Sequence, residues 1–220
     1  MLPNFLCIGA AKSGTTTLYE ILKQHPDIYC PKFKEPHFFD LPENYSKGIN
    51  WYEQTYFSSA DRKIIADLTP SYFYMDEVPK RIFQDLGKDV KFVVMLRNPV
   101  SRAYSHYLHS VRDHNEDLSF EDALREEEKR LKNHKAVKNH ILNLSHSYRG
   151  QGLYGEMLQR YLQYFSLSNF FFIDFEKDFI ENRQETICNL FQFLEIDSQI
   201  ELNLNIKSNP ASKERSVFLK

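Results

Sequence analysis

A glycine-containing loop near the N-terminus constrains this chain more than any other feature. Phe5–Ile8 is a short apolar run, the loop Gly9–Gly14 (GAAKSG) follows it, and Thr17–Leu22 then resumes with helical spacing until His25 and Pro26. A strand, a glycine loop and a helix in this order bring free backbone N–H groups and the positive end of a helix dipole to one point. The sequence therefore predicts an anion-binding site at this loop.

Apolar runs of strand length alternate with helical patterns along the rest of the chain. The runs are Lys63–Ala66, Lys91–Leu96 and Phe170–Phe175, and the helical patterns are Glu77–Leu86, Val100–Val111, Phe120–Leu142, Met157–Phe165 and Glu181–Leu194. This alternation predicts an α/β fold of three layers, with a mostly parallel central sheet flanked by helices. Because no repeat, linker or break in composition interrupts it, residues 1–220 are predicted to form a single domain.

The composition excludes several classes of protein. With 42% hydrophobic and 15% aromatic residues among 220, the chain can form a globular core. Lysine and arginine total 28 against 30 acidic residues, so no basic field favours nucleic acid and any anion site must be local. The three cysteines form no metal-ligand cluster, and no apolar run approaches the roughly 20 residues of a membrane segment. We therefore expect a cytoplasmic protein that binds neither a metal, nor a membrane, nor nucleic acid.

The loop departs from the nucleoside triphosphatase pattern G-x-x-x-x-G-K-[ST]. Gly9 and Gly14 fall in register, but Thr15 stands where the lysine belongs, and Lys12 lies inside the loop. The strand ending at Leu96 leads into Arg97, where such an enzyme would place an acid for Mg²⁺. These departures predict a ligand with one anionic group at the loop and another near Arg97, whose planar fork suits phosphate. Taken singly, a glycine turn and a surface salt bridge remain the alternatives.

Five segments together resemble a known family. They are IGAAKSGTTTLYEILKQHP (8–26), KEPHFFD (34–40), KGINWYEQTYF (47–57), LTPSY (68–72) and LRNPVSRAYSHY (96–107). The set is similar to that of PAPS-dependent sulfotransferases, and most of all to the carbohydrate type typified by heparan sulfate sulfotransferases and their bacterial relatives. PAPS is 3′-phosphoadenosine 5′-phosphosulfate. The resemblance implies a P-loop-type three-layer fold and an enzyme that moves the sulfuryl group of PAPS, without a metal, to a hydroxyl or amine of a carbohydrate or other small acceptor, leaving PAP.

The resemblance implies that protein groups hold the nucleotide at both ends. The residues corresponding to the 5′-phosphosulfate loop are Lys12, Ser13, Gly14, Thr15, Thr16 and Thr17. Arg97 and Ser105 correspond to the pair that holds the 3′-phosphate. Further nucleotide contacts are expected from Tyr148 and from a late basic loop containing Lys213, Arg215 and Ser216.

For catalysis, the resemblance makes Glu35 the general base and Lys12 the cation that stabilises the leaving phosphate. A carboxylate base needs a pKa raised toward neutrality, which we expect from apolar neighbours such as Phe33, Phe38 and Phe39. Aryl-type relatives use a histidine instead, and the candidates here are His37, His106 and His109. Without the resemblance, Glu35 is better interpreted as a surface carboxylate paired with Lys34.

Acceptor contacts are predicted from four side chains, each of which could equally belong to the core: His37, Asp40, Trp51 and Tyr72. Leu68 stands where several heparan sulfate enzymes carry a lysine, which argues against a glycosaminoglycan acceptor. The chain ends at Lys220, soon after the basic loop, which predicts a truncated or minimal version of the domain. Two other functions stay open, a P-loop kinase-like enzyme and a catalytically inactive nucleotide-binding module.

Overall fold

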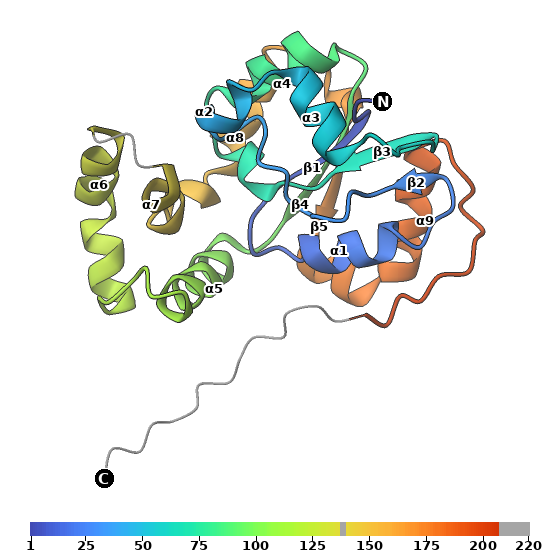
Figure 1. Ribbon diagram of the computed structural model, residues 1–220. Helices are drawn as coiled ribbons and strands as arrows, with labels where there is room; N and C mark the ends of the chain where they lie inside the picture. The colour runs from blue at the N-terminus through green and yellow to red at the C-terminus, as the bar shows by residue number, and fades with distance from the viewer. Residues whose placement is uncertain (137–139, 207–220) are drawn as a thin grey trace.

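Five parallel strands form the centre of the computed structural model, which describes residues 1–136 and 140–206 (Figure 1). The strands lie in the order β2-β3-β1-β4-β5, and their bounds are β1 (Phe5–Gly9), β2 (Ile28–Tyr29), β3 (Ile64–Asp67), β4 (Lys91–Leu96) and β5 (Phe170–Asp174). Four of them confirm the apolar runs of the sequence. The two-residue strand β2 is too short to show a period and was not predicted.

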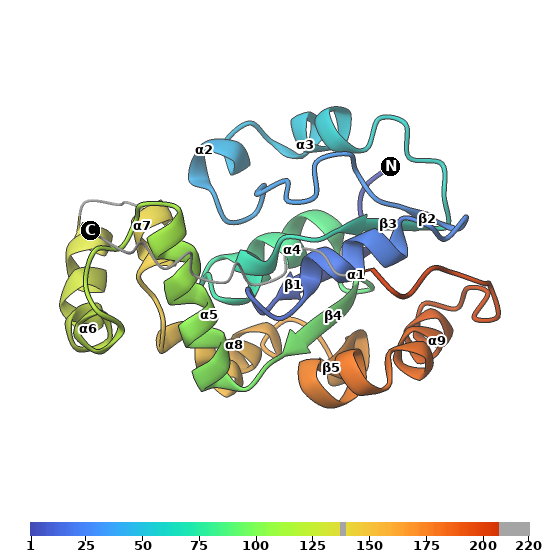
Figure 2. The same cartoon turned by 90° about the horizontal axis from the view of Figure 1, so that it is seen from below.

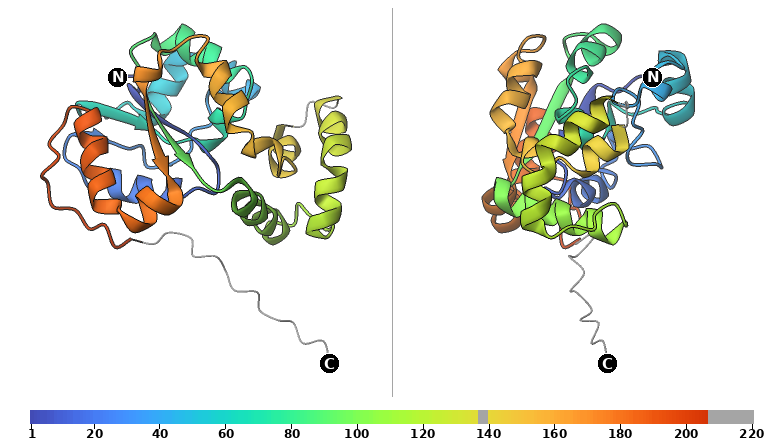
Figure 3. Two further views of the ribbon diagram at one scale, coloured as in Figure 1. Left: turned by 180° about the vertical axis from the view of Figure 1, so that it is seen from behind. Right: turned by 90° about the vertical axis from the view of Figure 1, so that its left-hand side faces the viewer.

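Side chains along the strands alternate between two hydrophobic layers. On β1, Leu6 and Ile8 belong to one layer, whereas Phe5 and Cys7 belong to the other. The first layer is completed by helices α3 (Ile49–Tyr56), α4 (Val78–Leu86) and α8 (Tyr154–Tyr161), and the second by α1 (Thr15–Leu22) and α9 (Arg183–Phe193). Figure 3 shows helices on both sides of the sheet. The three-layer α/β prediction is thus confirmed.

A helical arm projects beyond one end of the sheet (Figure 1). It comprises α5 (Pro99–Arg112), α6 (Phe120–Ala136) and α7 (His140–Ser145), and it has a small core of its own around Ala103, Ala123 and Tyr148. The single helix predicted over Phe120–Leu142 is wrong, because this stretch contains α6 and the start of α7. Nε2 of His134 on α6 lies 2.8 Å from Nδ1 of His146, the residue that directly follows α7.

The carboxyl ends of the parallel strands meet at one edge, where ligands collect in open α/β sheets. Here the glycine loop after β1 lies beside Pro70 and Phe73, because a Cβ atom on Gly9 would come within 2.9 Å of the Pro70 carbonyl oxygen. Arg97 follows β4 at the same edge, and α5 starts beside it (Figure 2). The edge therefore joins the two predicted anion positions. Within residues 1–136 and 140–206, no helix has the length and apolar character needed to cross a bilayer.

Candidate active site

The glycine loop leads directly into the N-terminus of α1. Gly14 is the N-cap of the helix with φ +88°, and a Cβ atom there would lie 2.8 Å from the Phe175 ring. The first intrahelical bond runs from the Leu18 N–H to the Gly14 carbonyl at 3.1 Å. The amides of Thr15 and Thr16 precede it and have no intrahelical acceptor. The loop thus supplies the N–H donors that an anion needs.

Two cations meet at this loop. Arg97 donates a hydrogen bond from Nη1 to the Lys12 carbonyl at 2.9 Å, and its guanidinium lies 5.0 Å from the centre of the Phe175 ring. Burial, together with the nearby charges of Arg112 and Arg97, lowers the pKa of Lys12 to about 8. The closest carboxylate oxygen to Arg97 belongs to Glu176, 3.7 Å from Nε. The loop and Arg97 are therefore neighbours, and the positive charges of Lys12 and Arg97 repel each other in the free protein.

Some buried donors at the loop have no hydrogen-bond partner. Their chemistry shows whether these residues fit a phosphorylated ligand. The Ser13 hydroxyl and the Arg97 Nε are buried without a hydrogen bond in the part of the chain that the structure describes. An unmet buried donor costs about 1–3 kcal/mol. Ammonium, guanidinium, hydroxyl and amide donors at one place match the oxygens of a phosphate or phosphosulfate. The donor set thus fits the nucleotide that the resemblance implies.

Glu35 lies close enough to Lys12 for its charge to affect the pKa of the lysine. Its carboxylate forms an ion pair with Lys34 and lies 3.5 Å from Nε2 of His37, with 37% of the side chain exposed. Lys34 in turn donates to the Thr15 hydroxyl at 3.4 Å, which ties the Glu35 segment to the start of α1. Although burial acts in the opposite direction, the His37 hydrogen bond and the Lys34 charge lower the pKa of Glu35 to about 2.

His37 stands between two carboxylates. Its Nδ1 donates to the Asp40 carboxylate at 2.8 Å, and the Ser71 hydroxyl donates to the same oxygen at 2.5 Å. Burial opposes the effect, but the hydrogen bonds to Asp40 and Glu35 raise the pKa of His37 to about 10. The Asp40 side chain is fully buried, so it orients His37 in this arrangement and does not face an acceptor.

The electrostatics contradict the expectation that aromatic neighbours raise the pKa of Glu35. Phe33 is 71% exposed, and Phe38 and Phe39 are buried in the core with Tyr52 and Tyr72. The groups next to the Glu35 carboxylate are the charged side chains of Lys34 and His37, not these three rings. The predicted apolar environment of Glu35 is wrong, because Lys34 and His37 surround it instead.

Two predicted ligand contacts lie in the interior. Tyr72 is fully buried, accepts a bond from the Phe38 N–H at 3.0 Å and donates to Asp67 at 3.0 Å. Tyr148 is also fully buried, and its hydroxyl donates to Glu116 at 2.8 Å. In this conformation their roles are structural, so neither an acceptor contact for Tyr72 nor a nucleotide contact for Tyr148 is supported by its position.

The remaining predicted residues fall in four groups. Trp51 is half-buried, with the Lys47 ammonium 4.2 Å from its ring centre. Ser105 is half-buried two turns into α5, and within the described ranges its hydroxyl has no hydrogen bond. Thr16 is half-buried and Thr17 is buried, both in the first turn of α1. Lys213, Arg215 and Ser216 lie outside the described residues.

The two histidines of α5 differ in position. Burial and the charge of Arg102 lower the pKa of His106, whose side chain faces the interior. His109 lies 3.2 Å from Asp113, and burial together with Lys12 lowers its pKa. Both are neutral at pH 7, but only His109 is partly exposed near the charges of the loop.

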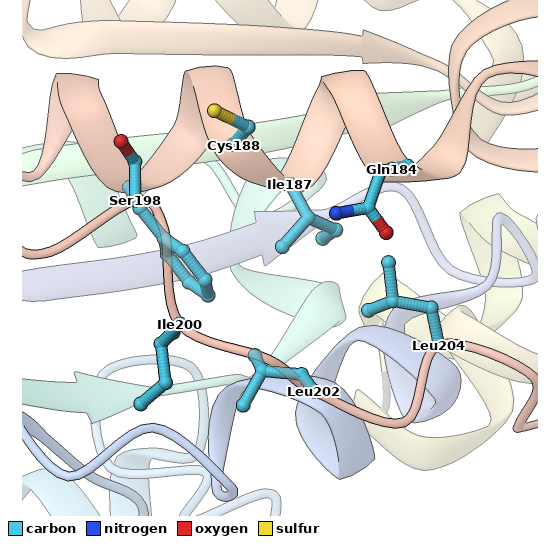
Figure 4. Close-up of a pocket in the computed structure, with 8 residues that line it drawn as sticks. Gln184, Ile187, Cys188, Ser198, Ile200, Leu202 and Leu204 are labelled. Carbon is cyan, nitrogen blue, oxygen red and sulfur yellow. The ribbon is translucent and has the colours of Figure 1, made fainter.

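Sequence reasoning missed Arg112, whose charge is a larger influence on Lys12 than that of Arg97. The signal that could have found it is helical spacing, because Ser105, His109 and Arg112 are separated by four and three residues and share one face of α5. Another hollow of the molecule, between α9 and residues 198–204, contains none of the predicted site residues (Figure 4).

Known proteins are similar to this chain. A family model described as the sulfotransferase domain matches residues 2–217. Heparan sulfate glucosamine 3-O-sulfotransferase 3B1 of Homo sapiens is 34% identical over 176 residues, which are 80% of this chain and 42% of that protein. Heparan sulfate glucosamine 3-O-sulfotransferase 5 of Mus musculus is 31% identical over 179 residues, 79% of this chain and 48% of that protein. The chain thus spans less than half the length of these relatives.

A solved structure agrees with the fold as well. A sulfotransferase from Alicyclobacillus acidocaldarius superposes with a TM-score of 0.82 at 31% identity, covering 96% of this chain and 87% of that one. A sulfotransferase domain from the curacin biosynthetic pathway, at 16% identity and a TM-score of 0.53, shares the fold alone. The match over almost the whole chain, on a fold whose glycine loop faces Arg97, means that the chain belongs to the PAPS-dependent sulfotransferase family.

Proposed function

We propose that this chain is a sulfotransferase that moves the sulfuryl group of PAPS to a hydroxyl or amine of a carbohydrate or other small acceptor and releases PAP. The observation that carries the proposal is that the Ser13 hydroxyl and the Arg97 Nε are buried without a hydrogen bond beside Lys12, whose pKa the charge of Glu35 also affects. Membership of the family supports PAPS as donor. The names of the relatives, which specify glucosamine 3-O-sulfation, support a saccharide as acceptor.

The nucleotide would be held by residues already close together. Lys12, the Ser13 hydroxyl and the amides at the start of α1 would bind the 5′-phosphosulfate, and Arg97 with Ser105 would bind the 3′-phosphate. When bound, PAPS supplies a sulfuryl group on a phosphate that can leave. Lys12 then stabilises the negative charge that develops at the loop, and loss of one such donor typically costs about 10²–10³ in rate.

The base of the proposed reaction is Glu35. Its low pKa keeps it ionised, and an acceptor hydroxyl that displaces Lys34 from the carboxylate would remove one of the charges that hold the pKa down. The His37–Asp40 contact favours a second candidate, because a buried carboxylate at Nδ1 fixes the ring with Nε2 toward Glu35. For His37 to act as base, its proton must first be lost, and both carboxylates oppose that loss.

The two alternative functions lack such support. A kinase-like enzyme would need a lysine at Thr15 and a metal-binding acid at Arg97. An inactive nucleotide-binding module would have no use for a carboxylate whose charge acts on Lys12, as that of Glu35 does.

Transfer from labelled PAPS to a panel of acceptors, led by glucosamine-containing oligosaccharides, tests the proposal. We expect a sulfated product and stoichiometric PAP in buffer containing EDTA. Transfer of the γ-phosphate of ATP that requires Mg²⁺ would contradict it in favour of the kinase-like enzyme. PAP binding without transfer to any acceptor would favour the inactive module.

A further inference from the structure

One arginine beside the proposed nucleotide site has no countercharge. The Arg102 side chain is 0% exposed, and its Nη2 donates to the Tyr148 carbonyl. Its Nε and Nη1 atoms have no hydrogen-bond partner among the described residues. A buried guanidinium normally has a carboxylate partner, because taking an unpaired charge out of water is costly.

Glu127 is the carboxylate whose charge acts on the pKa of Arg102, but it already has hydrogen-bond partners. Glu127 accepts bonds from the N–H groups of Arg149 and Gly150 at 2.9 Å, and no carboxylate in residues 1–136 and 140–206 forms an ion pair with Arg102. Burial, assisted by the charge of Arg97, lowers the pKa of Arg102 to about 10, so the side chain remains charged at pH 7. The free protein therefore carries an uncompensated positive charge at this position.

Arg102 lies close in the chain to Arg97 and Ser105, the residues proposed to bind the 3′-phosphate. Arg102 lies in the first turns of α5, three residues before Ser105 and on the same helix face. Its N–H donates to the Asn98 carbonyl at 2.9 Å, directly after Arg97. The Tyr154 hydroxyl, which donates to the Arg97 carbonyl at 2.9 Å, also lies near Arg102. Arg97 and Arg102 thus approach the same region from the strand end and from the helix.

We propose that Arg102 is a positioning residue that acts through Arg97, and that its buried charge makes the protein select nucleotides with a 3′-phosphate over nucleotides without one. The inference rests on the proposed binding of a 3′-phosphorylated adenosine nucleotide. Because the side chain is fully buried, it acts by the field of its charge and does not touch the ligand. A bound 3′-phosphate supplies the negative charge that the free protein lacks at this point.

A charge retained for binding predicts opposite effects on stability and affinity. Replacing a buried, uncompensated charge with an apolar side chain of similar length is often neutral or stabilising. The substitution also removes the donor to the Tyr148 carbonyl, so a lower melting temperature would mean that this bond outweighs the cost of the buried charge and that the arginine is structural.

Calorimetry on Arg102→Met, with Arg102→Lys as the conservative variant, tests the inference. The probes are PAP and adenosine 5′-phosphosulfate, which lacks the 3′-phosphate. We expect Arg102→Met to weaken PAP binding by about 10- to 100-fold and adenosine 5′-phosphosulfate binding by less than about threefold. Arg102→Lys should recover most of the PAP affinity, and the melting temperature of Arg102→Met should equal or exceed that of the wild type. Arg160→Met removes a partly buried arginine that is paired with Asp76 and serves as the control.

Two results would overturn the inference. One is a PAP affinity of Arg102→Met that equals that of the wild type. The other is an equal loss of affinity for both nucleotides together with a lower melting temperature, which would show a structural role. Failure of the proposed function itself looks different, because the wild-type protein would then bind neither nucleotide.

Discussion

The two sides of Lys12 differ in how far the free protein satisfies their polar groups. On the side of Glu35, every charged group has a partner: Lys34 pairs with Glu35, and His37 lies between Glu35 and Asp40. On the side of Arg97, the Ser13 hydroxyl and the Arg97 Nε are buried without a hydrogen bond, and the ion pair between Arg97 and Glu176 is long at 3.7 Å. The ion pairs are thus closer on the Glu35 side, where Asp40 Oδ1 is the buried atom left without a partner, whereas two donors lack hydrogen bonds on the Arg97 side.

This difference separates the two tasks of the site. Donors left unsatisfied in the free protein lose nothing when an anion binds, so the nucleotide side is preorganised for its ligand. The Glu35 side must exchange existing ion pairs for contacts with the acceptor before a proton can move. We therefore expect variants on the nucleotide side to change affinity, and variants on the Glu35 side to change turnover.

Glu35→Gln should show the largest effect. The amide keeps the shape of the side chain but cannot take a proton, so we expect transfer to fall by about 10²–10⁴. PAP affinity should stay within about twofold, because the nucleotide side is intact. Single-turnover transfer and calorimetry measure the two quantities separately. A variant as active as the wild type would remove Glu35 from the role of base.

Lys12→Ala should come next, with a loss of about 10²–10³ in the transfer rate and weaker PAP binding. The matched control is Lys91→Ala, which removes a lysine paired with Glu195 at the opposite end of β4 and should leave both quantities unchanged. Equal effects of the two substitutions on initial rates would contradict the role of Lys12.

The pH dependence of PAP binding should sharpen the comparison. Because the pKa of Lys12 is about 8, the ammonium loses its proton above that pH, and affinity should fall by up to about tenfold per pH unit. In Lys12→Arg the side chain stays charged, so this fall should disappear. Calorimetry between pH 7 and pH 9.5 measures both proteins. The same decline in both would place the titrating group elsewhere.

His37→Gln should show the smallest effect, on stability. The pKa of His37 is raised to about 10 in the folded protein from an ordinary value of 6.5, so the charged ring stabilises the fold below about pH 6.5. That contribution is lost as the pH rises through about 10. In urea unfolding, the stability difference between wild type and His37→Gln should therefore shrink from pH 6 to pH 10. A difference that stays constant would mean that His37 is neutral in the folded protein.

Local patterns in the sequence predicted the scaffold of the site. The loop before α1 and the arginine after β4 were expected because strand, glycine and helix signals lie within a few residues of each other. The parallel sheet then brings the two together, since its strands end at one edge. The role of Glu35 depended on the resemblance alone, because a carboxylate next to a lysine carries no local signal of a base.

Contacts across the chain could not be predicted. Tyr72 and Tyr148 have the same aromatic character in a core as in a binding site, and only the fold shows their burial. The Asp40 contact with Ser71 joins residues 31 positions apart, and it decides the orientation of His37. The effect of the Arg112 charge on Lys12 joins residues 100 positions apart and exists only in the folded chain.

Calorimetry of PAP binding in EDTA, with wild-type protein and Arg97→Ala, tests the central claim most directly. The account predicts saturable binding by the wild type without any divalent ion, and loss of that binding in Arg97→Ala at an unchanged melting temperature. Binding that requires Mg²⁺, or that is the same in both proteins, would contradict it.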